Sequence, residues 1–217
     1  MLDVRDLIEF DHELLLKINS WHSTFFDNWM WYYSQKWTWI GLYVLLIVYL
    51  IYRYRHNSVW ILIAIAATIG LADWGSHELK HLFMRPRPTH NATLSELIYI
   101  VNDYRGGAYG FPSSHACNSF ALTTIISLVS RDKILTTTLI LWSTINAYSR
   151  MYLGVHYPAD IATGTILGIL IGVVAYLPLH YTKKNKPSAY INESTNKYCT
   201  YSIPAMWIST MTIICFL

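Results

Sequence analysis

Apolar residues gather along the chain in six long runs, separated by shorter stretches that contain most of the charged residues. The runs cover about residues 37–52, 59–78, 116–130, 134–149, 158–179 and 203–217. A helix that crosses a bilayer needs about 20 mostly apolar residues, so several runs are close to the minimum length. We predict an all-α polytopic membrane helix bundle of about six apolar segments, in which the last run either spans the membrane or only dips into it.

The first 36 residues follow a different pattern, in which apolar residues recur at helical spacing with charged residues between them. The apolar positions are Leu7, Ile8, Phe10, Leu14, Leu15 and Ile18. This pattern predicts an amphipathic helix that lies along the membrane interface. The aromatic residues between Trp21 and Tyr33 extend the interfacial segment. The alternative is an additional, imperfect membrane span.

We divide the chain into an N-terminal interfacial segment at 1–36, a membrane core at 37–180, and a basic loop with an apolar segment at 181–217. Charged residues make up only 13% of the chain, against about 25% in soluble domains. Nine Trp and 17 Tyr suit the headgroup zone of a bilayer. The net charge of +3 is too small to indicate nucleic-acid binding. The three cysteines lie far apart and are odd in number, so they indicate neither a disulfide framework nor a zinc knuckle.

The most uniformly apolar run, 158–179, carries three glycines spaced four residues apart, namely Gly164, Gly168 and Gly172. Small residues at this spacing make one helix face flat, so that the backbone of a neighbouring helix can approach closely. We expect this face to pack inside the bundle rather than in a dimer interface.

Lysine and arginine residues occur in alternate connections between the apolar runs. The connections after the first, third and fifth runs contain Arg53, Arg55, Arg131, Lys133, Lys183, Lys184 and Lys186. The positive-inside rule places these connections in the cytoplasm. Residues 79–115 and 150–157 then face outward, although they also contain one lysine and several arginines. These outward cations weaken the assignment unless they serve another purpose.

The outward connections hold a concentrated set of polar residues at the ends of the apolar runs. In chain order they are Lys80, Arg87, Pro88, Pro112, Ser113, Ser114, His115, Ser149, Arg150, His156 and Asp160. Because successive spans alternate in direction, we expect these ends to meet at one face of the membrane. Ionisable groups close to the hydrocarbon are costly and usually mark a functional site.

These residues form a three-part pattern that resembles the signature of the type 2 phosphatidic acid phosphatase family. The parts are Lys80-x6-Arg87-Pro88, Pro112-Ser113-Ser114-His115 and Ser149-Arg150-x5-His156-x3-Asp160. The resemblance covers about residues 37–180 and implies a membrane phosphatase that acts on lipid phosphates. Ser114 stands where the family usually has glycine, at a backbone position expected to lie close to the phosphate.

The basic residues of the signature suit the binding of a phosphate group. Lys80, Arg87 and Arg150 can neutralise its negative charge, and the two arginines offer planar, bidentate donors. Ser113 and Ser114, together with backbone amides at the start of a helix, can add further donors. We therefore predict that these five residues bind the substrate.

The remaining residues of the signature suit nucleophilic catalysis. His156 is the candidate nucleophile, which would attack phosphorus to give a phosphohistidine. Asp160 would hold the other ring nitrogen of His156. His115 would protonate the leaving lipid oxygen and then activate the water that hydrolyses the intermediate. The resemblance implies the same roles, and no metal or other cofactor is expected.

Taken singly, each of these residues also has a structural interpretation: His115 as a helix cap, Asp160 as a first-turn acid, and Arg150 as a side chain that reaches the interface. His77 and His81 have the spacing of a helical metal pair and, with the other histidines, allow a zinc site as an alternative. Neighbouring cations disfavour it.

Two other classes of protein are alternatives to a lipid phosphatase. A non-catalytic lipid-binding or transport protein would use the cations but would not need both histidines and the aspartate. A haloperoxidase would hold vanadate in a similar pocket, but the apolar spans argue against it. Within residues 104–111, three glycines indicate either a mobile lid, with Arg105 near the substrate headgroup, or a plain connector.

The combined prediction is a metal-independent hydrolase of the cell envelope, placed in the bacterial inner (plasma) membrane with its site facing the periplasm. Its partners are the bilayer and a phosphorylated lipid. The resemblance allows undecaprenyl diphosphate, a lipid A phosphate, phosphatidylglycerophosphate and phosphatidic acid, of which we favour the first two. The oligomeric state stays open.

Overall fold

A computed structural model of the protein describes residues 3–182, 184 and 193–216. These residues form eight α-helices: α1 (Val4–Asn19), α2 (Thr24–Ser34), α3 (Ile40–Tyr54), α4 (Ser58–Phe83), α5 (Ser114–Ser130), α6 (Lys133–Tyr152), α7 (Pro158–Tyr181) and α8 (Glu193–Ile214). Within the described ranges, β-structure is limited to an isolated bridge between Pro86 and Tyr109. The predicted all-α class is confirmed.

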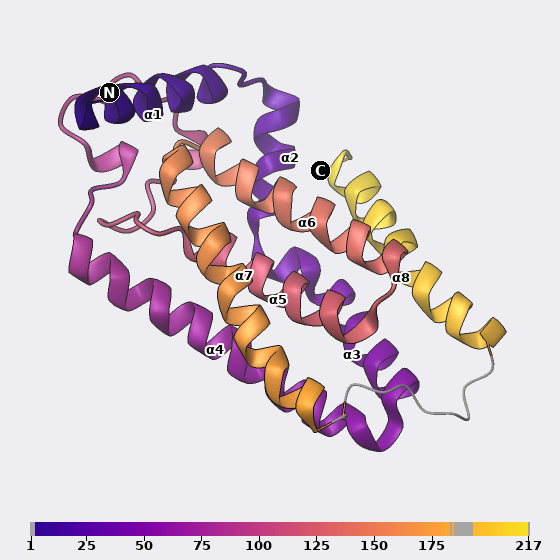
Figure 1. Ribbon diagram of the computed structural model, residues 1–217. Helices are drawn as coiled ribbons and strands as arrows, with labels where there is room; N and C mark the ends of the chain where they lie inside the picture. The colour runs from indigo at the N-terminus through magenta and orange to yellow at the C-terminus, as the bar shows by residue number, and fades with distance from the viewer. Residues whose placement is uncertain (1–2, 183, 185–192, 217) are drawn as a thin grey trace.

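The helices are arranged around α5, which packs against α4, α6 and α7 (Figure 1). On the other side of α6, α8 packs between α6 and α3. The first helix, α1, lies across one end of the bundle and contacts α6 and α7 there (Figure 1). The long connection between α4 and α5 runs under α1, so this end of the molecule contains most of its irregular backbone.

The glycine face of α7 packs against α5, as the sequence predicted. A Cβ atom at Gly164 would lie 2.5 Å from the carbonyl oxygen of Ser113, and one at Gly172 would lie 2.9 Å from that of Ala121. Neither position has room for a larger side chain without moving the backbone. The close approach of α7 to α5 therefore depends on these glycines.

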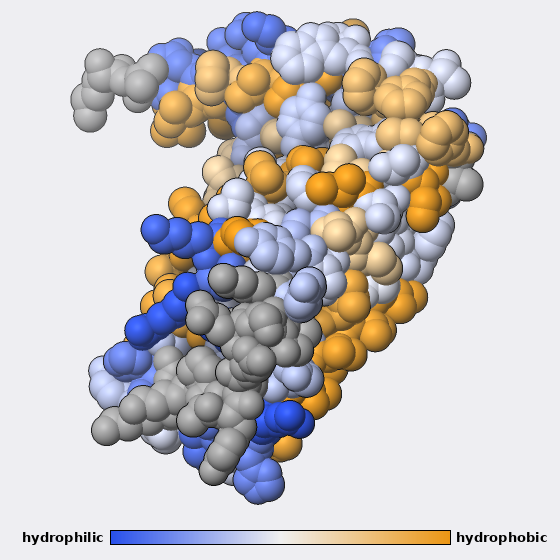
Figure 2. Space-filling model, turned by 90° about the vertical axis from the view of Figure 1, so that its right-hand side faces the viewer, coloured by the Kyte–Doolittle hydropathy of each residue, from blue (hydrophilic) through white to orange (hydrophobic). Residues whose placement is uncertain are grey.

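The outer surface of the bundle is apolar where a bilayer would surround it. Two helical stretches of the described chain, Lys36–Phe83 and Pro158–Tyr181, are long and apolar enough to cross a membrane. Large hydrophobic side chains are exposed on them, including Val48, Ile63 and Val174. In Figure 2 hydrophobic side chains run along the right-hand edge of the molecule, and hydrophilic side chains gather at its lower end. The chain is a membrane protein.

The basic connections lie together at the end of the bundle opposite α1. Arg53, near the end of α3, donates a hydrogen bond to the last carbonyl of α5 (3.1 Å). Arg131, in the α5–α6 turn, donates to the hydroxyl of Tyr176 near the end of α7 (3.3 Å). Lys183 and Lys186, which contribute to the same prediction, lie outside the described residues.

Two boundaries of the apolar runs were wrong. The second run was predicted to end at residue 78, but α4 continues to Phe83, so that Lys80 lies on the helix. The last run was predicted to start at residue 203, but α8 begins at Glu193. Hydropathy marks the part of a helix that suits hydrocarbon, whereas backbone hydrogen bonding continues beyond it.

The N-terminal segment forms two helices rather than one continuous interfacial segment. The apolar Leu15 and Ile18 are buried, while the charged Glu13 and Lys17 of the same helix are exposed, as expected of an amphipathic helix. In the first half of α1, however, the apolar Phe10 is 63% exposed. The helix ends at Asn19, and Ser23 starts α2 by accepting a hydrogen bond from the amide of Phe26 (3.4 Å). That α1 lies along the membrane interface remains a prediction.

Candidate active site

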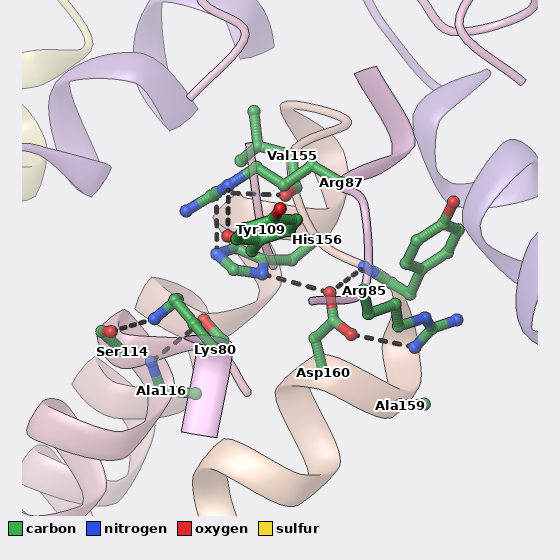
Figure 3. A network of polar contacts seen from close by, with 12 residues as sticks. Lys80, Arg85, Arg87, Tyr109, Ser114, Ala116, Val155, His156, Ala159 and Asp160 are labelled. Atoms are coloured by element: carbon green, nitrogen blue, oxygen red, sulfur yellow. Dashed lines mark hydrogen bonds and ion pairs between the residues drawn. The ribbon is translucent and has the colours of Figure 1, made fainter. Parts of the chain in front are cut away.

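The ends of α4 and α6 and the beginnings of α5 and α7 meet at the end of the bundle covered by α1, and they bring the residues of the predicted signature together. The residues that meet there are Lys80, Arg87, Ser113, Ser114, His115, Arg150, His156 and Asp160. Figure 3 shows part of this cluster, with His156 between Arg87 and Asp160. Residues far apart in the chain thus form one site.

His156 and Asp160 form a buried pair at the start of α7. The Nδ1 atom of His156 lies 3.3 Å from Oδ2 of Asp160, and the two side chains are 1% and 0% exposed. Asp160 occupies the third position of α7, where its Oδ2 also accepts a hydrogen bond from the amide of Tyr157 (3.1 Å). The spacing of four residues therefore places a carboxylate beside the imidazole and at the positive end of the helix.

Arg87 settles which nitrogen of His156 carries the proton. Its Nη1 lies 3.0 Å from Nε2 of His156. Because a guanidinium can only donate, Nε2 must accept, and the proton is on Nδ1, where it faces Asp160. Burial, followed by the positive charges of Arg87 and Arg150, holds the pKa of His156 well below its usual range. The imidazole is therefore neutral, with its Nε2 lone pair directed at the cations.

A short two-stranded contact holds Arg87 in place. The amide of Arg87 donates to the carbonyl of Ala108 (3.0 Å), and the amide of Gly110 donates to that of Arg85 (3.0 Å). A Cβ atom at Gly110 would lie 2.8 Å from Oδ2 of Asp160. The glycine-rich connection therefore passes directly over the His156–Asp160 pair, and only glycine leaves room for the carboxylate.

Lys80 reaches the site from the last turn of α4. Its Nζ atom donates a hydrogen bond to the hydroxyl of Ser114. That hydroxyl also accepts a hydrogen bond from Ser76, one turn earlier on α4 (2.8 Å). Ser114, the position where the resembled family usually has glycine, thus fixes the ammonium group of Lys80 at the start of α5.

Ser113 and His115 flank Ser114 but face different surroundings. Ser113 is the N-cap of α5, and its buried hydroxyl accepts from the amide of Ala116 (3.5 Å). Its O–H is the donor that remains for a ligand. His115 is half-buried and has no hydrogen bond within the described part of the chain. It lines a cavity of about 390 Å³.

This cavity lies between α3, α4, α5 and α6, and its walls are mostly apolar. Its polar end holds Lys36, Ser114 and His115, while Leu122 and Ile126 line it two and three turns farther along α5. A hollow of this kind extends from the signature residues into the part of the bundle that a bilayer would surround. It suits a hydrocarbon chain better than water.

Arg150 supplies the third cation from the last turn of α6. It is 2% exposed. Its Nη2 donates to the hydroxyl of Tyr104 (3.1 Å), and its guanidinium lies 5.3 Å from the centre of the same ring. Its Nε atom is buried and has no hydrogen-bond partner in the described residues. One donor of Arg150 is thus unused.

Three residues of the site were not predicted. Tyr104 holds Arg150, and Arg85 forms ion pairs with Asp160 and with Asp11 of α1. The sequence offered one signal for Arg85, because Arg85-Pro86 precedes Arg87-Pro88 and repeats its pattern. No local pattern distinguishes Tyr104 or Asp11 from other aromatic or acidic residues of the chain.

The alternative zinc site does not form within the described residues. The rings of His77 and His81 pack against each other with their centres 4.6 Å apart. No group of three His, Cys, Asp or Glu side chains in the described ranges is arranged to hold a metal ion. The side chain of Arg105, which was a candidate for the substrate headgroup, donates to the carbonyl of Thr89 (3.4 Å), and the hydroxyl of Thr89 donates to the carbonyl of Arg105 (2.7 Å).

Comparison with known proteins points to one family. The model of the PAP2 superfamily matches residues 58–184. The lipid A 4′-phosphatase of Bacteroides thetaiotaomicron is 37% identical over a match that covers 80% of this chain and 79% of that protein. The lipid A 4′-phosphatase of Porphyromonas gingivalis is 30% identical, with 82% and 76% covered.

Two solved structures have a similar fold. The crystal structure of LpxE from Aquifex aeolicus superposes with a TM-score of 0.58 at 26% identity, covering 75% of this chain and 92% of that one. A PAP2-type phosphatidylglycerolphosphate phosphatase from Bacillus subtilis gives a TM-score of 0.62 at 18% identity, covering 82% and 87%. The second likeness concerns the fold alone.

Proposed function

Because the chain belongs to the PAP2 superfamily and is a lipid phosphate phosphatase, we propose that it removes the 4′-phosphate of lipid A at the outward face of the bacterial inner membrane. The two lipid A 4′-phosphatases support this choice, since each matches about four fifths of the chain. The undecaprenyl-diphosphatase of Bacillus subtilis matches 44% of it at 26% identity. Undecaprenyl diphosphate is therefore the second candidate.

The observation that carries the proposal is the buried guanidinium of Arg150 with its unused Nε donor. A buried donor without a partner costs free energy, which an oxygen of a bound phosphate would recover. Lys80 and Arg87 add two positive charges beside it. A phosphate monoester carries about two negative charges near neutral pH, so these three cations match its charge and that of its transition state.

The first chemical step is attack by Nε2 of His156 on phosphorus. When phosphate binds, the Nη1 donor of Arg87 turns from Nε2 to a phosphate oxygen and releases the lone pair. The new P–N bond forms as the P–O bond to the lipid breaks, and His115 gives its proton to the leaving lipid oxygen. Asp160 stabilises the positive charge that develops on the ring of His156.

The second step returns the enzyme to its initial state. His115, now neutral, takes a proton from a water molecule as the water oxygen attacks phosphorus. The P–N bond breaks, and its electron pair returns to Nε2 of His156. Inorganic phosphate leaves, and the protonated His115 is ready for the next lipid. Neither step consumes a cofactor.

The apolar cavity supports a lipid as the substrate. Its polar end holds His115, which is assigned to the leaving oxygen, and its apolar walls run along α3 and α5. A hydrocarbon chain placed there would pass from one apolar surrounding to another and would stay out of water. The phosphate then lies at the cations while a tail of the lipid lies among the helices.

The orientation of the site rests on the basic connections at the opposite end of the bundle. Arg53 and Arg131 lie there, and the positive-inside rule assigns that end to the cytoplasm. The site then faces the periplasm, where it meets lipids of the outer leaflet.

The proposal is tested by phosphate release from lipid A, undecaprenyl diphosphate, phosphatidylglycerophosphate and phosphatidic acid by purified protein in excess chelator. We expect release from the 4′-position of lipid A to be fastest and to disappear in His156→Ala. Faster release from undecaprenyl diphosphate would show that this lipid, and not lipid A, is the preferred substrate. Lipid binding without release from any of the four would support a binding or transport protein instead.

A further inference from the structure

Arg85 occupies a special position between two carboxylates. Its Nη1 lies 2.9 Å from Oδ1 of Asp160, and its Nη2 lies 2.6 Å from Oδ2 of Asp11. The guanidinium stacks on Tyr157 with its central carbon 4.0 Å from the ring centre. Figure 3 shows Arg85 on the side of Asp160 that faces away from His156. Arg85 therefore contacts Asp160 on the side opposite His156, away from the position proposed for the phosphate.

The two oxygens of Asp160 have separate partners. Oδ2 faces Nδ1 of His156 and the amide of Tyr157, while Oδ1 accepts from Arg85. A carboxylate that is 0% exposed needs a paired cation to stay charged, since isolated buried charges are costly. Arg85 supplies that cation and stops the carboxylate from rotating. Oδ2 consequently remains directed at the imidazole.

Asp11 brings the first helix of the chain into this arrangement. Its Oδ2 holds Arg85, and its Oδ1 accepts a hydrogen bond from the amide of Ala159 in the first turn of α7 (2.8 Å). Asp11 is 7% exposed, although it lies on the amphipathic helix α1. An acidic residue at a buried position of α1 is thus explained by its two contacts with the start of α7.

We propose that Arg85 is a positioning residue for the phosphoryl-transfer reaction, and that Asp11 of α1 sets its orientation. This inference rests on the proposed function, because it assigns Arg85 to the support of the His156 nucleophile. Arg87 differs from Arg85 in that it touches Nε2, the reacting atom. The guanidinium of Arg85 bonds to two carboxylates and stacks on Tyr157, so its effect on His156 passes through Asp160.

The inference predicts a loss of turnover without a loss of substrate binding. Arg85→Gln should lower kcat about 10- to 100-fold, the range for partners that orient a reacting group, and leave KM within about twofold. Arg85→Lys, which keeps the charge, should recover part of the loss. Asp11→Asn should have a smaller effect, and the double variant should equal Arg85→Gln, because Asp11 acts through Arg85.

Glu13→Gln is the matched control, because Glu13 is an exposed carboxylate on the same helix. It should leave kcat unchanged. A kcat of Arg85→Gln within about twofold of the wild type, or a change confined to KM, would overturn the inference. Activity that survives His156→Ala would instead contradict the proposed function, so the two failures are distinguishable.

A second measurement does not depend on activity. The ¹⁵N spectrum of histidine-labelled protein in detergent, with His156→Ala to identify the signals, reports which ring nitrogen carries the proton. The shift of the ring N–H proton reports how strongly that proton is hydrogen-bonded. The wild type should show His156 protonated at Nδ1, with the proton shifted downfield by its contact with Asp160. Arg85→Gln should keep this tautomer, which Arg87 fixes, but should reduce the downfield shift. An unchanged Nδ1 proton shift in Arg85→Gln would contradict a positioning role.

Discussion

The two halves of the site hold their histidines in opposite ways. On the α7 side, His156 is 1% exposed and lies between Asp160 and Arg87, within hydrogen-bonding distance of both. On the α5 side, His115 is half-buried, has no hydrogen bond within the described residues and faces an apolar cavity. A nucleophile benefits from one fixed geometry, whereas a group that serves as acid and then as base must reach two different oxygens. The difference fits the roles proposed for the two residues.

The largest expected effect comes from removing the carboxylate that holds His156. Asp160→Asn should lower kcat about 10⁴-fold, because an amide no longer favours the proton on Nδ1 of His156. Asp132→Asn is the matched control, since Asp132 also starts a helix but lies at the opposite end of the bundle. Single-turnover phosphate release measures both. A loss below about tenfold for Asp160→Asn would mean that His156 does not need the carboxylate.

A smaller effect is expected from removing the imidazole of His115, and its size should depend on the leaving group. His115→Ala should slow the hydrolysis of a lipid phosphate roughly 10³-fold, since both proton transfers lose their donor or acceptor. An aryl phosphate, whose leaving group needs no proton, should still react once with His156. The expected result is a burst of phenol followed by slow turnover. His56→Ala, at an exposed histidine near the opposite end, serves as the control.

Filling the apolar cavity beside His115 tests whether this cavity binds the tail of the lipid. Leu122→Trp would occupy part of the cavity and should raise KM for a long-chain substrate about 10-fold, which corresponds to about 1.4 kcal/mol. A short-chain phosphate ester should be unaffected. Ile166→Trp adds the same side chain to the outer face of α7, where Ile166 is 59% exposed. Equal KM values for long and short substrates in Leu122→Trp would exclude the cavity as a tail site.

The smallest expected effect is a shift in titration of the fixed histidine. Because the pKa of His156 is lowered well below 6.5, its ring should stay neutral at about pH 5.5, where an exposed histidine is mostly charged. Between its folded pKa and 6.5 the unfolded chain binds the additional proton. The contribution of His156 to stability is therefore lost as the pH falls below 6.5. A ¹⁵N titration that places its midpoint near 6.5 would contradict this account.

The sequence predicted the part of the site that is contained in local spacing. His156 directly precedes the N-cap Tyr157, and Asp160 lies in the first turn of α7, so a spacing of four residues is enough to bring them together. The glycines of α7 likewise predicted its close packing. The support from Arg85 and Asp11 could not be predicted in this way, because Asp11 meets Ala159 only through the packing of α1 against the bundle. Contacts between such distant segments leave no periodic signal in a single sequence.

The central claim is that the phosphoryl group passes through Nε2 of His156, and the His115→Ala variant offers the most direct test. The variant is incubated with an aryl phosphate in excess chelator, quenched in alkali, digested and mapped by mass spectrometry. The account predicts phosphate on the peptide that contains His156 and none in the double variant with His156→Ala. Phosphate on Ser113 or Ser114, or no covalent phosphate together with continued turnover, would contradict it.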